Sequence, residues 1–100
     1  MILTILEATV AAEQWSTLQQ AYQRGIAHLP AQMVQTFLVQ QTKDPTKWQI
    51  LSLWQSREAL DEYRQATGTP EGILWFRAAG AEPSLVVSQV IAHAAQPAPE

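Results

Sequence analysis

The residues of this sequence best suited to proton transfer are a carboxylate and an imidazole near apolar segments. Glu7 follows the mostly apolar run Ile2 to Leu6. Two interpretations stay open: an end-of-strand residue in contact with water, or a cavity acid whose pKa burial would raise. His28 lies in the last turn of a helical pattern, where a positive charge suits the negative end of the helix dipole. The chain has no cysteine and 2 histidines far apart, so we expect no disulfide, no Cys nucleophile and no metal site.

Composition limits the classes of partner that the chain can have. Its 100 residues predict one domain with a thin core. Hydrophobic residues make up 47% and charged residues only 15%, so we expect apolar surface that a second copy of the chain covers. A net charge of −3 argues against a nucleic-acid partner, and no apolar run approaches the ~20 residues of a membrane span. Because no signal peptide is visible either, we expect a cytoplasmic protein.

A change of hydrophobic period marks the segment around which the elements are arranged. From Trp48 to Trp54 the side chains alternate between two faces, as in a strand. From Ala59 to Tyr63 the apolar residues recur at helical spacing. Ser56, between the two, has a side-chain oxygen that can cap the first free N–H groups of a helix. The segment therefore predicts a strand that runs directly into a capped helix.

The same segment carries a resemblance to a known family. The residues concerned are Asp44-Pro45, Trp48 to Trp54, Gln55-Ser56-Arg57-Glu58-Ala59-Leu60 and Tyr63. With them the chain resembles the antibiotic biosynthesis monooxygenase family over roughly residues 1 to 93. Members of that family are small proteins with a dimeric α/β barrel built on a ferredoxin-like half, so the resemblance implies this fold and a second subunit.

The remaining sequence completes an α+β order of elements. We predict strands over Ile2 to Val10, Gln32 to Gln41, Trp48 to Trp54 and Ser84 to His93, and helices over Ala12 to Leu29, Ser56 to Thr67 and Glu71 to Gly80. Thr69 is the expected N-cap of the short third helix. The order is that of a ferredoxin-like βαββαβ fold with an extra short helix and a four-stranded antiparallel sheet. Residues 1–93 form the expected domain, and residues 94–100 a flexible C-terminal tail.

Both faces of the predicted strands are largely apolar, although helices can cover only one. An apolar face with a few polar groups such as Glu7 is typical of a ligand pocket. We therefore predict a homodimer in which two sheets face each other and enclose a cavity for a small apolar or aromatic molecule.

The resemblance implies a chemistry: oxidation of electron-rich aromatic compounds, such as anthrones and quinols, by O₂ without a cofactor. The protein must then bind a flat ring, accept a proton, stabilise the anion and exclude water. We expect Phe76 among the aromatic walls, and Tyr22 and Tyr63 among the donors. The resulting predictions are Glu7 and Tyr63 as catalytic residues, Phe37, Trp48, Trp54, Trp75 and Arg77 as substrate-binding residues, and neither cofactor nor metal.

Departures from the family's pattern bear on which function to expect. Many relatives have a His near the position of Tyr63, and a tyrosine with a pKa near 10 is a poor base. A haem-degrading branch uses an axial His on the later helix, but residues 71–79 contain none, so we expect no haem. The alternative that stays open is a non-catalytic dimeric barrel that binds an apolar metabolite or has a structural role. A Glu7 that opens onto the cavity beside Trp54 would favour the enzyme.

Overall fold

Burial alternates residue by residue along two neighbouring strands, and this alternation identifies the face that the helices cover. The computed structural model describes residues 1–97. Every second side chain of β1 (Ile2–Thr9) and of β3 (Lys47–Trp54) is buried, and those between are mostly half-buried. The sheet therefore has one covered face and one open face.

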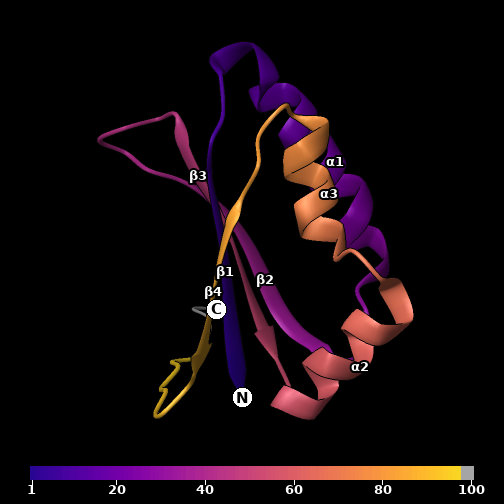
Figure 1. The fold of residues 1–100 in the computed structure, drawn as a ribbon. Helices are drawn as coiled ribbons and strands as arrows, with labels where there is room; N and C mark the ends of the chain where they lie inside the picture. Colours follow the sequence, from indigo (N-terminus) through magenta and orange to yellow (C-terminus); the bar gives the residue numbers. More distant parts are fainter. Residues whose placement is uncertain (98–100) are drawn as a thin grey trace.

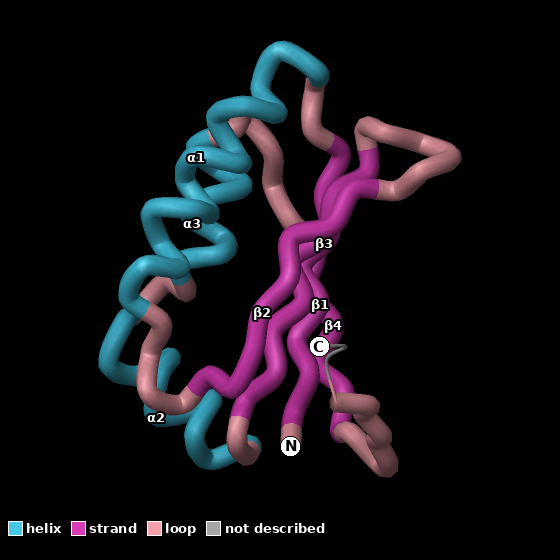
Figure 2. The backbone as a smooth tube through the Cα atoms, turned by 180° about the vertical axis from the view of Figure 1, so that it is seen from behind, coloured by secondary structure: helices cyan, strands magenta, loops and turns pink. Residues whose placement is uncertain are grey.

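The sheet has four antiparallel strands in the order β2-β3-β1-β4. The two edge strands are β2 (Met33–Gln40) and β4 (Ser84–Gln89). Figure 1 shows the helices on one side of this sheet, and Figure 2 shows the same two layers from behind. The predicted ferredoxin-like α+β fold is confirmed, including the extra helix.

The helical layer consists of α1 (Trp15–Gly25), α2 (Arg57–Thr67) and α3 (Glu71–Ala78). Short 3₁₀ turns, η1 (Ala12–Gln14) and η2 (Ile26–His28), flank α1, so the predicted first helix is an α-helix with a tighter turn at each end. Helices α1 and α3 lie side by side over the sheet (Figure 1).

Two groups of buried side chains fill the space between the layers. The larger one includes Leu18 and Phe76, both fully buried, with Ile50 from the sheet. The smaller one joins Trp54 of β3 to Leu60 and Tyr63 of α2. Burying each large apolar side chain contributes on the order of 1.5–3 kcal/mol, so these contacts hold the layers together.

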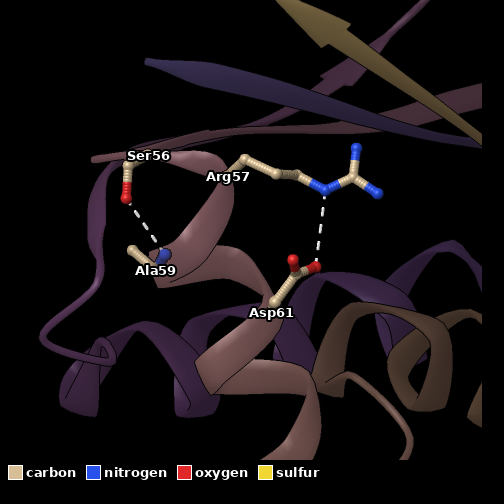
Figure 3. A network of polar contacts seen from close by, with 4 residues as sticks. All are labelled: Ser56, Arg57, Ala59 and Asp61. Atoms are coloured by element: carbon tan, nitrogen blue, oxygen red, sulfur yellow. Dashed lines mark hydrogen bonds and ion pairs between the residues drawn. The ribbon is translucent and has the colours of Figure 1, made fainter.

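The predicted junction between β3 and α2 is confirmed in detail (Figure 3). The Ser56 hydroxyl accepts a hydrogen bond from the Ala59 N–H at 3.0 Å. Arg57 follows directly and forms an ion pair with Asp61, one turn further along α2. Nε and Oδ1 are 3.4 Å apart, and this exposed pair is of small energetic value. Gly68 has φ +77°, a left-handed conformation that favours glycine, and it ends α2 as predicted.

The last strand ends at Gln89 rather than at the predicted His93. Gln89 lies opposite Ile2, the first residue of β1, and the Val90 N–H then donates to the Met1 carbonyl at 3.0 Å. Ile2–Gln89 is thus the last residue pair of the ladder between β1 and β4. Residues 94–97 of the predicted tail have no helix or strand, and residues 98–100 lie outside the described part of the chain.

Within residues 1–97, none of the helices has the length and apolar character needed to span a bilayer.

Candidate functional site

A mostly apolar pocket lies between the covered face of the sheet and the helices. The sheet contributes Thr4, Thr36, Ser52 and Trp54, α2 contributes Leu60, Tyr63 and Arg64, and α3 contributes Ile73 and Trp75. Glu71 and the exposed Leu29 also line it. Small side chains on its floor leave space that larger ones would fill, which explains a pocket on the covered face.

Two aromatic rings form one wall of the pocket. The ring centroids of Trp54 and Tyr63 are 4.8 Å apart, with the planes tilted by 41°. Trp54 Nε1 donates to Thr4 Oγ1 at 2.9 Å, so the indole ring is fixed by the neighbouring strand. A fixed indole offers an aromatic surface for a flat ligand at little entropic cost.

Tyr63 also ties two helices together through its hydroxyl. The phenolic oxygen accepts a hydrogen bond from the Glu71 N–H at 3.1 Å, at the start of α3. This corrects the prediction for Thr69: Pro70 occupies the N-cap position without a side-chain bond, and Tyr63 satisfies the free N–H instead. Burial raises the pKa of the Tyr63 hydroxyl, while the bond from the Glu71 N–H opposes that rise. Tyr63 is therefore a neutral hydrogen-bond donor near neutral pH, and not a base.

The opposite wall depends on a glycine. A Cβ added to Gly25 would lie only 1.9 Å from Cζ2 of Trp75, so the indole occupies the space that any larger residue would need. Tyr22 meets the same indole edge-to-face, with centroids 5.5 Å apart. Gly25 thus allows Trp75 to reach the pocket from α3.

The pocket is narrow. Its free volume is about 50 Å³, whereas a cavity that holds benzene has roughly 150 Å³. An aromatic ligand must therefore displace part of the wall. Exposed Leu29 and the start of α3 lie at the pocket and can yield more readily than the sheet.

Three of the predicted site residues, Trp54, Tyr63 and Trp75, meet in this pocket. Glu7 and Phe37 instead belong to the open face of the sheet, opposite Gln49 and Leu51 of β3. Glu7 was expected to open onto a cavity beside Trp54. Within one chain the two side chains do not share a cavity, because they point to opposite faces of the sheet. A cavity between two sheets stays a prediction.

The other two predicted residues lie elsewhere. Trp48 is buried beside Trp15, with ring centroids 6.0 Å apart, and its Nε1 has no hydrogen-bond partner among the described residues. Arg77 is exposed and donates two hydrogen bonds to Glu82, at 2.9 and 2.8 Å. Neither residue lines the pocket described above.

Sequence reasoning missed Thr4, Arg64 and Glu71 as pocket residues. Thr4 shares strand parity with the buried residues of β1, a signal that is readable only when the covered face is known. Arg64 and Glu71 lie at the facing ends of α2 and α3, which a sequence pattern does not bring together. Among residues 1–97, no group of three or more His, Cys, Asp or Glu side chains is placed to hold a metal ion.

Comparisons with known proteins agree with this architecture. The family model described as antibiotic biosynthesis monooxygenase matches residues 1–69. A proposed antibiotic biosynthesis monooxygenase from Deinococcus radiodurans superimposes with a TM-score of 0.75 at 12% identity, over 98% of this chain and 100% of that chain. No curated protein sequence matches the chain significantly.

Two further structures share the fold at similarly low identity. SnoaB, a cofactor-independent oxygenase from Streptomyces nogalater, has a TM-score of 0.70 at 12% identity, over 92% of this chain and 94% of that chain. An MhuD variant with two manganese protoporphyrin IX molecules bound per active site has a TM-score of 0.72 at 16% identity, over 96% and 100%. The family match, which covers most of the chain, and the shared fold lead to one conclusion: the chain belongs to the antibiotic biosynthesis monooxygenase family.

Proposed function

We propose that the chain is a cofactor-independent monooxygenase that oxidises a small aromatic or quinol-type compound with O₂. The observation that carries the proposal is the Trp54–Tyr63 wall, which combines an aromatic surface with a phenolic donor inside an apolar pocket. The fold of SnoaB, a cofactor-independent oxygenase, supports the same reaction class.

The reaction needs no electron source besides the substrate. Loss of a proton from an activated ring methylene leaves a carbanion, which passes an electron to O₂ and then combines with the superoxide formed. The resulting peroxide is protonated and loses water. One oxygen atom remains as a new carbonyl, the other leaves in water, and both methylene hydrogens are consumed. The protein has to accept the first proton and stabilise the anion in a dry site.

The pocket-lining residues divide these tasks. Trp54 faces the ring, and the neutral Tyr63 hydroxyl donates a hydrogen bond to the oxygen on which the anionic charge accumulates. Glu71 is the carboxylate that lines the pocket among the described residues, so it is the base proposed for this site. Its backbone N–H bond to Tyr63 keeps base and donor adjacent.

Oxygen uptake with an anthrone, which has such a ring methylene, tests this assignment against the base predicted from sequence. We expect Glu71→Gln to lower kcat by about 10²- to 10⁴-fold, as loss of general base catalysis does. Glu7→Gln is the matched control, because the same carboxylate is neutralised on the open face; we expect its kcat to stay unchanged. A loss of kcat in Glu7→Gln but not in Glu71→Gln would contradict this assignment and would identify Glu7, on the open face, as the base.

A second function has its own supporting observation. Glu71 is exposed, so the described pocket holds no buried base. A non-catalytic barrel that binds an apolar metabolite is therefore the alternative. It predicts that an aromatic ligand raises the melting temperature by mass action while O₂ uptake stays at the spontaneous rate.

We also propose a homodimer through the open face of the sheet. Phe37, Leu51, Ile5 and Val86 lie opposite one another in turn, which makes an apolar row across all four strands. Phe37 is 51% and Val86 54% exposed. An apolar row of this length on a small domain is typical of an interface, and a second copy of the same face covers it symmetrically.

A further inference from the structure

A row of hydroxyl side chains crosses the floor of the pocket. Thr36 lies opposite Ser52, and Ser52 lies opposite Thr4, so three neighbouring strands each contribute one hydroxyl at the same level. The levels on either side are apolar, with Leu38, Ile50 and Leu6 on one side and Met33, Trp54 and Ile2 on the other. The pocket thus has one polar line on an otherwise apolar floor.

The hydrogen bonds of this row leave one proton without an acceptor. Thr4 receives the Trp54 N–H and directs its own proton to the Ser52 carbonyl, at 3.4 Å. Thr36 Oγ1 and Ser52 Oγ lie 3.2 Å apart and share one hydrogen bond, which uses only one of their two protons. The second proton has no other acceptor within residues 1–97, although Ser52 is only 6% exposed.

An unused hydroxyl donor in an apolar site favours ligands that bring an acceptor. Ser52 is buried and Thr36 is half-buried, so part of the donor's desolvation cost has been met before the incoming oxygen binds. A hydrocarbon of the same shape leaves the donor unpaired. Sites of this kind discriminate more strongly by hydrogen bonding than by shape alone.

We propose that the Thr36–Ser52 hydroxyl pair selects aromatic ligands that carry a carbonyl or phenolic oxygen. That oxygen lies at the sheet, and the ring lies against Trp54 and Tyr63. The inference rests on the proposed function in placing the ligand in this pocket, but it requires binding only and no turnover. Its new content is the assignment of oxygen recognition to two side chains of the sheet, Thr36 and Ser52.

The test compares two ligands that differ by one oxygen, 1-tetralone and tetralin, by titration calorimetry. We expect the wild-type chain to bind 1-tetralone about tenfold more tightly than tetralin. The Thr36→Val/Ser52→Ala variant removes both hydroxyls with little change of volume, and its preference should fall below about twofold. Thr17→Val/Ser16→Ala makes the same chemical changes at exposed positions of α1 outside the pocket and should keep the tenfold preference.

Three outcomes would overturn the proposal: no preference in the wild type, binding of neither ligand, or a preference that persists in the pocket variant. If the double variant does not fold, Thr36→Val/Ser52→Cys gives the same comparison, because valine has no hydroxyl and a thiol is only a weak donor. The titrations are run without O₂, so that they measure binding without turnover. A preference that depends on the pair, without oxygen uptake from anthrones, would therefore support this inference while removing the monooxygenase. Oxygen uptake without the preference would do the opposite.

Discussion

At the scale of single residues, Tyr63 contributes both to the packing of the helices and to the wall of the pocket. Its oxygen accepts the Glu71 N–H, its ring lies against Trp54, and burial raises the pKa of its hydroxyl. Sequence reasoning could predict that Tyr63 is buried, from its place on the apolar side of a helix. It could not predict the bond to α3, because that bond joins two helices whose relative placement no local pattern contains.

Tyr63→Phe removes the hydroxyl and leaves the Glu71 N–H without its acceptor. We expect the free energy of unfolding to fall by about 0.5–1.5 kcal/mol, measured by urea denaturation. Tyr22→Phe is the matched control, since its hydroxyl makes no hydrogen bond among residues 1–97 and its ring contact with Trp75 is retained. Equal losses in the two variants would mean that the bond to α3 contributes nothing.

The pKa of Tyr63 also predicts a dependence on alkaline pH. A pKa that is raised in the folded state means that folding favours the neutral phenol. This stability is fully present below the unfolded value of about 10 and is lost as pH rises through the higher folded value. Urea curves below and above pH ~10 should show a steeper loss of stability for the wild type than for Tyr63→Phe. Parallel losses would contradict the raised pKa.

At the scale of elements, local signals were sufficient where one residue determines a boundary. Ser56 caps α2 and Gly68 ends it, as predicted from their types alone. The end of β4 was predicted wrongly, because it depends on where β1 begins and not on the β-forming residues Val90 and Ile91.

The cap of α2 gives a direct test of such a local signal. Ser56→Ala removes the acceptor of the Ala59 N–H and should cost about 0.5–2 kcal/mol. Chemical denaturation measures the loss, and Ser88→Ala on the open face of β4 is the control expected to change little. A neutral Ser56→Ala would show that water replaces the cap.

The contact between α1 and α3 leads us to expect that Gly25→Ala lowers the free energy of unfolding, which is unusual for such a change in a helix. Glycine to alanine in a helix normally stabilises by up to about 1 kcal/mol. At Gly25 the new methyl group collides with Trp75, so we expect a loss of about 1–3 kcal/mol.

A double-mutant cycle separates these two effects. In a Trp75→Ala background the obstacle is absent, and Gly25→Ala should become stabilising by about 0.5–1 kcal/mol. If Gly25→Ala destabilises equally in both backgrounds, the cause is not the indole.

At the scale of the whole molecule, the face of the sheet that the helices cover determines which side chains line the pocket. The sequence predicted the sheet and both of its apolar faces, but it could not say which face the helices cover. That face depends on the strand register, which brings Thr4, Ser52 and Trp54 together and sends Glu7 and Phe37 to the other side. Of the residues that line the pocket, Trp54, Tyr63 and Trp75 were named from sequence as site residues, whereas Thr4 and Glu71 were not.

The apolar row on the open face of the sheet is the basis for a test of the proposed homodimer. Phe37→Glu places a charge in the apolar row and should convert the proposed dimer to a monomer. Sedimentation velocity measures the mass, and Gln19→Glu adds the same charge on an exposed part of α1 as the control. A wild-type chain that sediments as a monomer would refute the proposed interface, and so would a dimer unchanged by Phe37→Glu.

One measurement tests the proposed activity most directly: oxidation of an anthrone under ¹⁸O₂, with the product analysed by mass spectrometry. The account predicts product formation well above the spontaneous rate, with one labelled oxygen in the new carbonyl and one O₂ consumed per product, in the absence of added metal or cofactor. A rate equal to that of the heat-denatured chain would contradict the monooxygenase, and so would a new carbonyl whose oxygen comes from water.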